Sequence, residues 1–302
     1  MLKIQHKGFI ILLFVFVALF AFSSCNNNEE EETQNDTIDS AEMHNPTIVK
    51  INDRLFSVPS PFQIAILIKD NDVPYDKALL NPVQNQVNYS TNYKQALNLG
   101  IYGADLSYLN IYEQLPDAAS YFAVVKVLSK SLGISSTLDE KVIKRIENNS
   151  NNKDSLLYIL STIYRNADAY LFNNDRNEVG LLILAGGWVE SLYLMTKTIK
   201  VKNNQEIINR IGEQKHPLDN LIELLRPYYG KISDEFDVFL EDLVELAAIF
   251  DGVVIEYTYS EPIVDEANKL TTITSETKII INEYQIDKVT EMIDSIRTKI
   301  IN

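Results

Sequence analysis

The stretch that decides the fold is Thr91–Tyr112, with the sequence TNYKQALNLGIYGADLSYLNIY. Apolar side chains recur in it every three or four residues, which is the spacing of one face of an α-helix. The residues on that face are Tyr93, Leu97, Gly100 or Ile101, Ala104, Tyr108, and Ile111 or Tyr112. The stretch therefore predicts a long helix that packs against other helices.

Helical signals continue on both sides of this stretch. Ser60 and Pro61 form an N-cap and a first-turn proline, and they predict a helix to Lys69. Pro116 starts another helix, which ends at Gly133. The remaining helices are expected at about 137–148, 153–173, 177–199, 204–229 (with a break near 212–217) and 234–251. The fold class predicted is mostly α, a bundle of about eight or nine helices stacked as helical hairpins.

The last part of the chain has a different pattern. Residues 253–259 and 270–281 are rich in β-branched and aromatic residues, and the segment between them contains Pro262. This pattern predicts a long-looped β-hairpin over about 253–281. An isolated hairpin is only marginally stable in water, so it should lean on the helices. A final amphipathic helix is expected over about 283–301.

The beginning of the chain predicts a signal peptide over residues 1–24. Lys3 and Lys7 precede the apolar run Phe9–Phe22. As a helix these residues would measure about 21 Å, which is short of a hydrocarbon core of about 30 Å. Cys25 follows and is the only cysteine of the 302 residues, so no disulfide can form within the chain. We expect Cys25 to be the lipidation site, and the alternative is a secretory signal followed by a chance cysteine.

Residues 25–57 are expected to be a disordered acidic tether, because they contain too little apolar surface to fold. The single helical domain would then span residues 58–302. Thr37 and Ser40 lie in the tether, in the triplets Asp-Thr-Ile and Asp-Ser-Ala.

Several of these segments resemble known lipoprotein features. Phe22–Cys25 resembles the lipobox of bacterial lipoproteins, and the asparagine and glutamate run Asn26–Glu32 resembles the surface-export signals of Bacteroidota lipoproteins. The triplets around Thr37 and Ser40 resemble the O-glycosylation sites of that phylum. The resemblance implies an outer-membrane lipoprotein, held by acyl chains such as palmitate and displayed at the cell surface rather than in the periplasm.

The domain also carries motifs that resemble an uncharacterised group of helical Bacteroidota lipoproteins. They are Ser60-Pro61-Phe62, Ile101-Tyr102-Gly103-Ala104-Asp105 and Gly186-Gly187-Trp188. This resemblance implies neither an activity nor catalytic residues.

The charge of the chain excludes one class of partner. The net charge is −15, and removal of residues 1–24 leaves 25 basic against 42 acidic residues, a net charge of −17. Nucleic-acid binding needs a basic patch, which this composition lacks, so we expect no nucleic-acid partner.

Histidine and cysteine are too scarce for several kinds of site. His6 lies in the signal peptide and His44 in the tether, which leaves His216 in the domain, at a predicted helix break. A tetrahedral zinc site of nitrogen and sulfur ligands is therefore excluded. Ser-His or Cys-His catalysis would depend on His216, which we interpret as a surface or capping residue. We expect no cofactor and no metal.

Three carboxylates are candidates for acid–base chemistry. Asp105 and Asp168 lie in similar short stretches, residues 102–109 and 164–171, and Glu190 follows a pair of glycines. Two carboxylates that face one cleft about 5–10 Å apart could hydrolyse a glycoside. The alternative is that they pair with Arg165 or with tyrosine hydroxyls and only specify helix packing.

A second candidate is a ligand pocket around Gly186, Gly187 and Trp188. Two glycines inside a helix cost about 2 kcal/mol relative to alanines, so some contact should compensate. The contact would be either the crossing of the helix that carries Gly100, or a ligand. In the second case the pocket could also include Tyr102, Arg165, Glu190 and Tyr193.

Three functions therefore remain open from the sequence, with enzyme activity uncertain. The first is a lipid-anchored envelope protein whose helical domain binds an unknown protein or a small molecule. The second is a carboxylate-based hydrolase that acts outside the cytoplasm. The third is a structural subunit of an envelope assembly, which should expose a large apolar patch.

Overall fold

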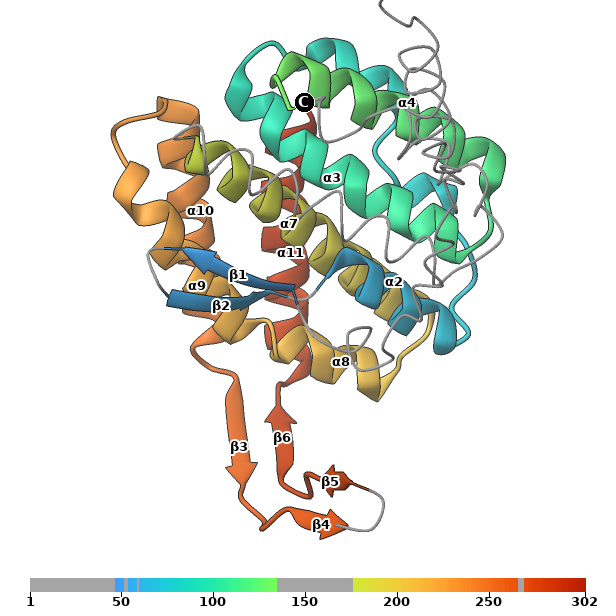
Figure 1. The fold of residues 1–302 in the computed structure, drawn as a ribbon, viewed down its shortest axis with the longest axis vertical. Coiled ribbons are helices and arrows are strands. Elements are labelled where there is room, and N and C mark those ends of the chain that lie inside the picture. Colours follow the sequence, from blue (N-terminus) through green and yellow to red (C-terminus); the bar gives the residue numbers. More distant parts are fainter. Residues whose placement is uncertain (1–46, 52–53, 59, 135–175, 266–268) are drawn as a thin grey trace, which may run out of the picture. The chain divides into compact units, whose positions relative to one another are not determined.

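The computed structural model describes residues 47–51, 54–58, 60–134, 176–265 and 269–302. These residues contain eight α-helices, three short 3₁₀ helices and three two-stranded sheets (Figure 1). The α-helices are α2 (Pro61–Asp70), α3 (Asn92–Ile111), α4 (Leu115–Ser131), α7 (Asn177–Val201), α8 (Gln205–Gly212), α9 (Lys215–Leu225), α10 (Asp234–Phe250) and α11 (Glu283–Ile301). The 3₁₀ helices are η2 (Lys77–Leu79), η3 (Val83–Asn88) and η5 (Arg226–Tyr228). The predicted mostly α fold is confirmed.

Helix boundaries follow the capping residues in the sequence. The Thr91 hydroxyl accepts a hydrogen bond from the Lys94 amide (3.2 Å) at the start of α3. The Asn282 side chain accepts one from the Gln285 amide (2.9 Å) at the start of α11. Gly133, just after α4, has a φ of +76°, a conformation that favours glycine. The helices expected at about 137–148 and 153–173 lie outside the described residues.

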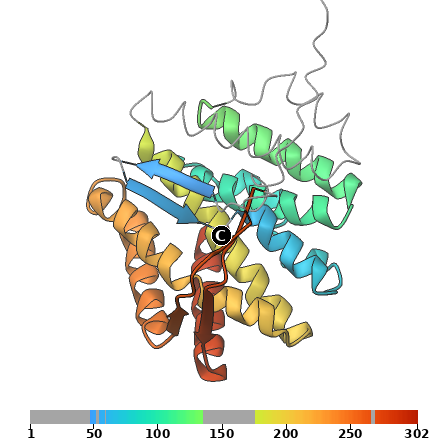
Figure 2. The same ribbon diagram turned by 60° about the horizontal axis from the view of Figure 1, so that its bottom comes forward.

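Helix α7 is the central element, and most of its residues are buried. It packs against α3, α11 and α2, and Figure 2 shows that α4, α3, α7 and α11 follow one another across the bundle. Among the described residues, α7 is the one helix long and apolar enough to cross a membrane. However, 89% of its apolar window is buried inside the fold, as in the core helix of a globular domain.

Glycines allow α3 and α7 to approach closely where they cross. A Cβ atom on Gly186 would lie 1.9 Å from the carbonyl oxygen of Leu97, and one on Gly100 would lie 2.0 Å from that of Ile183. No side chain fits at such distances, so the two positions require glycine. This is the helix-crossing alternative from the sequence, and it explains how the fold offsets glycine's low helix propensity.

The C-terminal strands form an arm, which we call the β-arm and define as residues 254–265 and 269–280. Strand β3 (Val254–Thr258) pairs antiparallel with β6 (Glu276–Ile280). Between them, β4 (Ile263–Asp265) pairs with β5 (Leu270–Thr272). The prediction of a hairpin is confirmed. The strand predicted over 270–281 is divided into β5 and β6, however, and β5 pairs with β4 inside the predicted loop, where Ile263 and Val264 are β-branched residues that favour strands.

A further strand pair lies where the sequence predicts the end of the tether. Strand β1 (Thr47–Ile51) pairs antiparallel with β2 (Arg54–Val58), with Thr47 opposite Val58. The prediction of disorder up to residue 57 is therefore wrong for these residues. The physical reason is that both segments are rich in residues with high strand propensity and are separated by two residues, the spacing of a tight hairpin.

Candidate functional site

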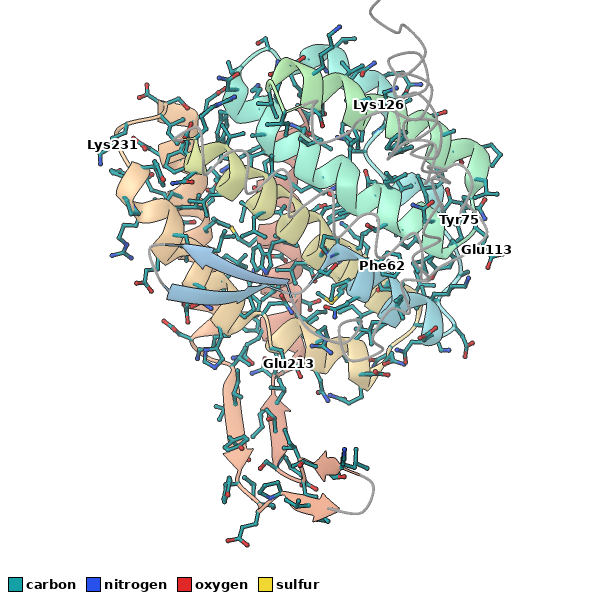
Figure 3. The ribbon with its side chains drawn as sticks, in the orientation of Figure 1. Phe62, Tyr75, Glu113, Lys126, Glu213 and Lys231 are labelled. Carbon is teal, nitrogen blue, oxygen red and sulfur yellow. The ribbon has the colours of Figure 1, made fainter. Side chains whose placement is uncertain are left out.

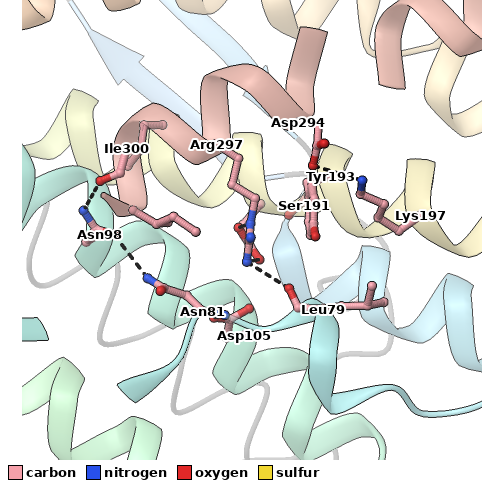
Figure 4. Close-up of polar contacts among 12 residues, drawn as sticks. Leu79, Asn81, Asn98, Asp105, Ser191, Tyr193, Lys197, Asp294, Arg297 and Ile300 are labelled. Carbon is pink, nitrogen blue, oxygen red and sulfur yellow. Dashed lines mark hydrogen bonds and ion pairs between the residues drawn. The ribbon is translucent and has the colours of Figure 1, made fainter. Parts of the chain in front are cut away.

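A buried cluster of charged side chains joins α3, α7 and α11 (Figure 4). Arg297 on α11 donates two hydrogen bonds to the carboxylate of Glu190 on α7, from Nε at 2.6 Å and from Nη2 at 2.8 Å. Nη2 also donates to the carbonyl oxygen of Leu79 (2.9 Å). The guanidinium carbon lies 4.0 Å from the ring centre of Tyr193. Bidentate pairing and a stacked ring are the strongest setting for a buried guanidinium.

Asp105 on α3 is the third ionisable member of this cluster, and it is fully buried. Its Oδ2 accepts a hydrogen bond from the backbone amide of Asn81 (3.0 Å). No donor among the described residues reaches Oδ1, since the neighbouring group is the Glu190 carboxylate. Two carboxyl groups can share a hydrogen bond only when one of them carries a proton.

Burial and the charge of Glu190 together set the protonation of Asp105. Burial has the largest effect and raises the pKa of Asp105 well above its ordinary value, and the Glu190 charge raises it further. Arg297 and the Asn81 amide act in the opposite direction without cancelling this shift. Burial alone would lower the pKa of Arg297, but Glu190 more than offsets that effect, so the guanidinium stays charged. Burial and the Glu190 charge thus both favour the protonated form of Asp105, next to the ion pair of Glu190 with Arg297.

Buried amide side chains extend this cluster to the last turn of α11. The side-chain amide of Asn81 donates to the Tyr89 hydroxyl (3.0 Å) and to Oδ1 of Asn98 (3.3 Å). Asn98 in turn donates to the carbonyl oxygen of Ile300 (2.9 Å), and Tyr89 donates to that of Ile301 (3.2 Å). The last carbonyls of a helix have no partner within the helix, so these bonds cap α11 from α3 and η3.

The residues predicted to line a ligand pocket lie in the core instead. Trp188 is 2% exposed, and its indole N–H donates to Gln214 (3.1 Å). Tyr102 is fully buried and donates to the carbonyl oxygen of Pro82 (2.8 Å). Gly186 lies at the helix crossing, and Gly187 lies beside it. The structure does bring these residues close to the charged cluster, but their surfaces are used for packing.

The remaining predicted site residues cannot be placed. Asp168, Arg165, Cys25, Thr37 and Ser40 all lie outside the described residues. His216 is described and is exposed in the first turn of α9, as a surface residue.

Arg297 is the central residue of the cluster, and it does not appear among the sequence-predicted sites. A signal for it exists, since Arg297 lies four residues after Ile293 and three before Ile300, both buried. A basic residue at that spacing falls on the buried face of a helix and needs a buried partner. The sequence does not show which acid that partner is.

The cluster has no surface on which to act chemically. Asp105 and Glu190 are both fully buried, so this pair does not form the open cleft that glycoside hydrolysis needs. Within the described ranges, no group of three or more histidine, cysteine, aspartate or glutamate side chains could hold a metal ion. A groove of about 400 Å³ lies elsewhere, between α9 and α10, and none of the predicted site residues that the structure describes lines it. We interpret the cluster as a device that fixes α11 against α3 and α7.

The β-arm shows the opposite arrangement, with apolar side chains on the outside. Six of its large apolar residues are between 57% and 78% exposed, and we call them the arm surface. They are Tyr257, Tyr259, Ile263, Val264, Leu270 and Ile273. Figure 3 shows side chains filling the space between the helices, whereas along the β-arm they stand away from the ribbon.

The base of the β-arm is the part that contacts the helices. Ile279 of β6 is partly buried and lies against Gly212 at the end of α8, where a Cβ atom would be 2.4 Å from the isoleucine side chain. The β-arm is thus attached to the core at its base, and the residues of the arm surface are exposed to solvent. Single exposed apolar residues are common, but six on one short projection are not.

No protein family, no curated protein and no solved structure was found to match this chain.

Proposed function

We propose that the protein is a lipid-anchored envelope protein whose helical domain binds another protein through the β-arm. The observation that carries the proposal is the arm surface, where six large apolar side chains are exposed on the strands β3, β4 and β5 and in the residues that directly follow β3 and β5. Apolar surface that gathers in one place costs free energy in water, and it is typical of an interaction site. Tyrosine, which supplies two of the six residues, is enriched at such sites.

The buried cluster supports binding rather than catalysis. Glu190 forms an ion pair with Arg297, and Asp105 is buried beside this pair. A hydrolase would need at least one of these acids to reach a substrate, and neither has exposed surface. The observed groove between α9 and α10 contains Asp219 and Glu223 but also Arg226, and it offers no paired acids from the predicted set.

The proposed anchor is the lipid on Cys25, with the preceding residues removed. The support is the sequence: two lysines, a short apolar run and two serines before the cysteine. Acyl chains would hold the protein at the outer membrane, since each buried methylene contributes about 0.8 kcal/mol. The acidic run after Cys25 favours display at the cell surface.

Substitution of Cys25 and protease treatment of whole cells test the anchor and its orientation. Cys25→Ser should move the protein from the membrane fraction to the soluble fraction and remove the labelling by palmitate. Protease added to intact cells should release the domain of the unsubstituted protein. Resistance of the domain to protease in intact cells would contradict surface display but not lipidation.

Photo-cross-linking in living cells tests the binding role of the β-arm. A photoreactive amino acid in place of Ile273, which is 78% exposed, should give a defined adduct with one other protein. The control is the same amino acid in place of Val201, which is 65% exposed at the end of α7 and is far from the arm in sequence. Equal adducts from both positions, or none from residue 273, would contradict the proposal.

A structural role in an envelope assembly is a second candidate, because the arm surface also fits the apolar patch that such a role requires. The two candidates differ in the stability of the complex. A structural subunit should migrate in one large complex of fixed composition after mild detergent extraction. A protein that binds its partner reversibly through the β-arm should be recovered mostly as a free chain.

A further inference from the structure

The edges of the β-arm offer backbone groups for pairing. Strands β3 and β6 form one two-stranded sheet, and β4 and β5 form another, so each strand has one edge that pairs with no described strand. The N–H and C=O groups along such an edge can pair with an added strand. Peptide recognition by strand addition uses this arrangement, with backbone bonds for affinity and alternate side chains for specificity.

The side chains beside these edges are apolar and acidic. The described residues of the β-arm include four acidic residues and two lysines. One lysine, Lys278, already lies across from Glu256, with 3.7 Å between Nζ and Oε2. Glu261 and Glu276 are exposed, and neither forms an ion pair with a described residue. A segment that lies along the arm would therefore meet apolar side chains next to uncompensated negative charge.

We infer that the occupant of the β-arm is an extended, basic segment of a different protein, with alternating apolar and lysine or arginine residues, that adds as a strand to the arm's edge. This inference rests on the proposed function and names the class of partner. The apolar side chains of the segment would cover Tyr257 and Tyr259, and its cations would lie beside Glu261 and Glu276. Complementary charge of this kind selects the partner and speeds association.

The charge of the chain argues against a second copy as the occupant. Without residues 1–24, two copies would each bring a net charge of −17, and two arms in contact would bring acidic residues together. An anionic membrane surface is disfavoured for the same reason. The open strand edges, the exposed tyrosines and the acidic groups together fit a basic polypeptide.

Two synthetic peptides of matched strand propensity test the inference. The first has the sequence KVTVKVTVK and the second EVTVEVTVE, each with a fluorescent label, and binding to the purified chain without residues 1–25 is followed by anisotropy. The basic peptide should bind, and its Kd should rise at least about tenfold between 50 and 500 mM NaCl, because salt screens exposed charges. The acidic peptide should bind at least about tenfold more weakly.

Variants of the β-arm show whether binding occurs there. Glu261→Lys with Glu276→Lys should reverse the preference between the two peptides. The matched control, Glu245→Lys with Asp251→Lys, makes the same change of charge at exposed positions on and just after α10, and should leave the preference unchanged. Circular dichroism of each variant confirms that it is folded.

The outcomes separate this inference from the proposed function. Residue 273 could cross-link to a partner in cells while the arm variants leave both the binding of the basic peptide and the preference for it over the acidic peptide unchanged. In that case the inference is overturned and the binding role stands. If the purified chain forms a dimer that is lost with Tyr257→Ser, or binds phosphatidylglycerol vesicles through the arm, the occupant is a second copy or a membrane, and the inference is wrong. If the photoreactive residue at position 273 gives no adduct, the proposed function is wrong, and the inference that rests on it is wrong as well.

Discussion

The helix crossing at the centre of the molecule and the β-arm at its edge use their residues in opposite ways. At the crossing of α3, α7 and α11, the polar and ionisable side chains are buried and take part in hydrogen bonds within the bundle. They are two acids, an arginine and several amides. On the β-arm, apolar residues that would normally form a core are exposed. Burial, not residue type, thus separates the part that holds the fold together from the part that is free to bind.

Residue type alone does not identify a site in this molecule. Asp105, Glu190 and Trp188 are residue types found in many active sites, yet here each one satisfies a partner inside the bundle. The exposed isoleucines and tyrosines of the β-arm carry no catalytic chemistry. They nevertheless form the surface that another protein could cover.

Removal of Arg297 should have the largest effect on the core. Arg297→Met leaves Glu190 and Asp105 buried without a cation, and loss of one partner from such a pair costs about 3–5 kcal/mol of unfolding free energy. The control on the same helix is Lys299→Met, because Lys299 pairs with Asp242 (2.7 Å) but is about half exposed. That variant should lose less than about 1 kcal/mol. Urea unfolding measures both, and equal losses would contradict the assigned role of the cluster.

Gly186→Ala should be the next most damaging change. Its Cβ atom would overlap the Leu97 carbonyl, so α3 and α7 must separate, at a cost of about 2–3 kcal/mol. Gly187→Ala is the matched control one residue away, where the nearest atom, Cγ of Pro61, is 3.4 Å from the added Cβ. Its unfolding free energy should change by less than about 1 kcal/mol. The close crossing would be refuted by two variants that unfold alike.

Asp105→Asn tests the proton in the cluster through its pH dependence. Because the folded-state pKa of Asp105 lies above its ordinary value of 3.8, the folded chain binds this proton more tightly than the unfolded chain does. The contribution of Asp105 to stability is therefore present at low pH and is lost as the pH rises above about 4.

The asparagine variant carries no such proton, so its stability relative to the unsubstituted chain should increase with pH above that value. The limiting slope is about 1.4 kcal/mol for each pH unit. Urea unfolding at pH 4, 5, 6 and 7 measures this difference. A difference that stays constant with pH would show that Asp105 is ionised in the fold.

Changes on the arm surface should have the smallest effect on stability. Tyr257 and Tyr259 are 64% and 67% exposed, so Tyr257→Ser with Tyr259→Ser should change the unfolding free energy by less than about 1 kcal/mol. The same assay on Phe236→Ser, a fully buried aromatic residue, provides the contrast. A loss of several kcal/mol in the tyrosine variant would show that the β-arm is part of the core.

Local signals in the sequence were enough to predict most of the fold. The cap Ser60 with Pro61, the helical spacing of apolar residues from Tyr93 onward, the glycine after α4 and the β-branched segments were enough to predict the described helices and the pairing of β3 with β6. They could not give the pairing of Glu190 with Arg297, since the two residues are 107 positions apart and nothing local links them. For the same reason the site predictions named the acids without their cation.

Two strand pairs also escaped prediction, for a different reason. Strands β1 and β2 follow an acidic segment, and the low hydrophobicity of that segment as a whole concealed two short runs of strand-forming residues. Residues 270–272 lie within a predicted strand, but β4 and β5 are three residues each, which is too short for an alternating pattern to show that they pair with each other.

The most direct test of the central claim compares variants of the buried cluster and of the β-arm by one measurement. This measurement is the yield of the cross-linked adduct from a photoreactive residue at position 273 in living cells. The adduct should persist in chains with Asp105→Asn, because the enclosed acid takes no part in binding. It should be lost in chains with Tyr257→Ser and Tyr259→Ser, which remain folded. An adduct that disappears with Asp105→Asn and persists without the two tyrosines would contradict the account.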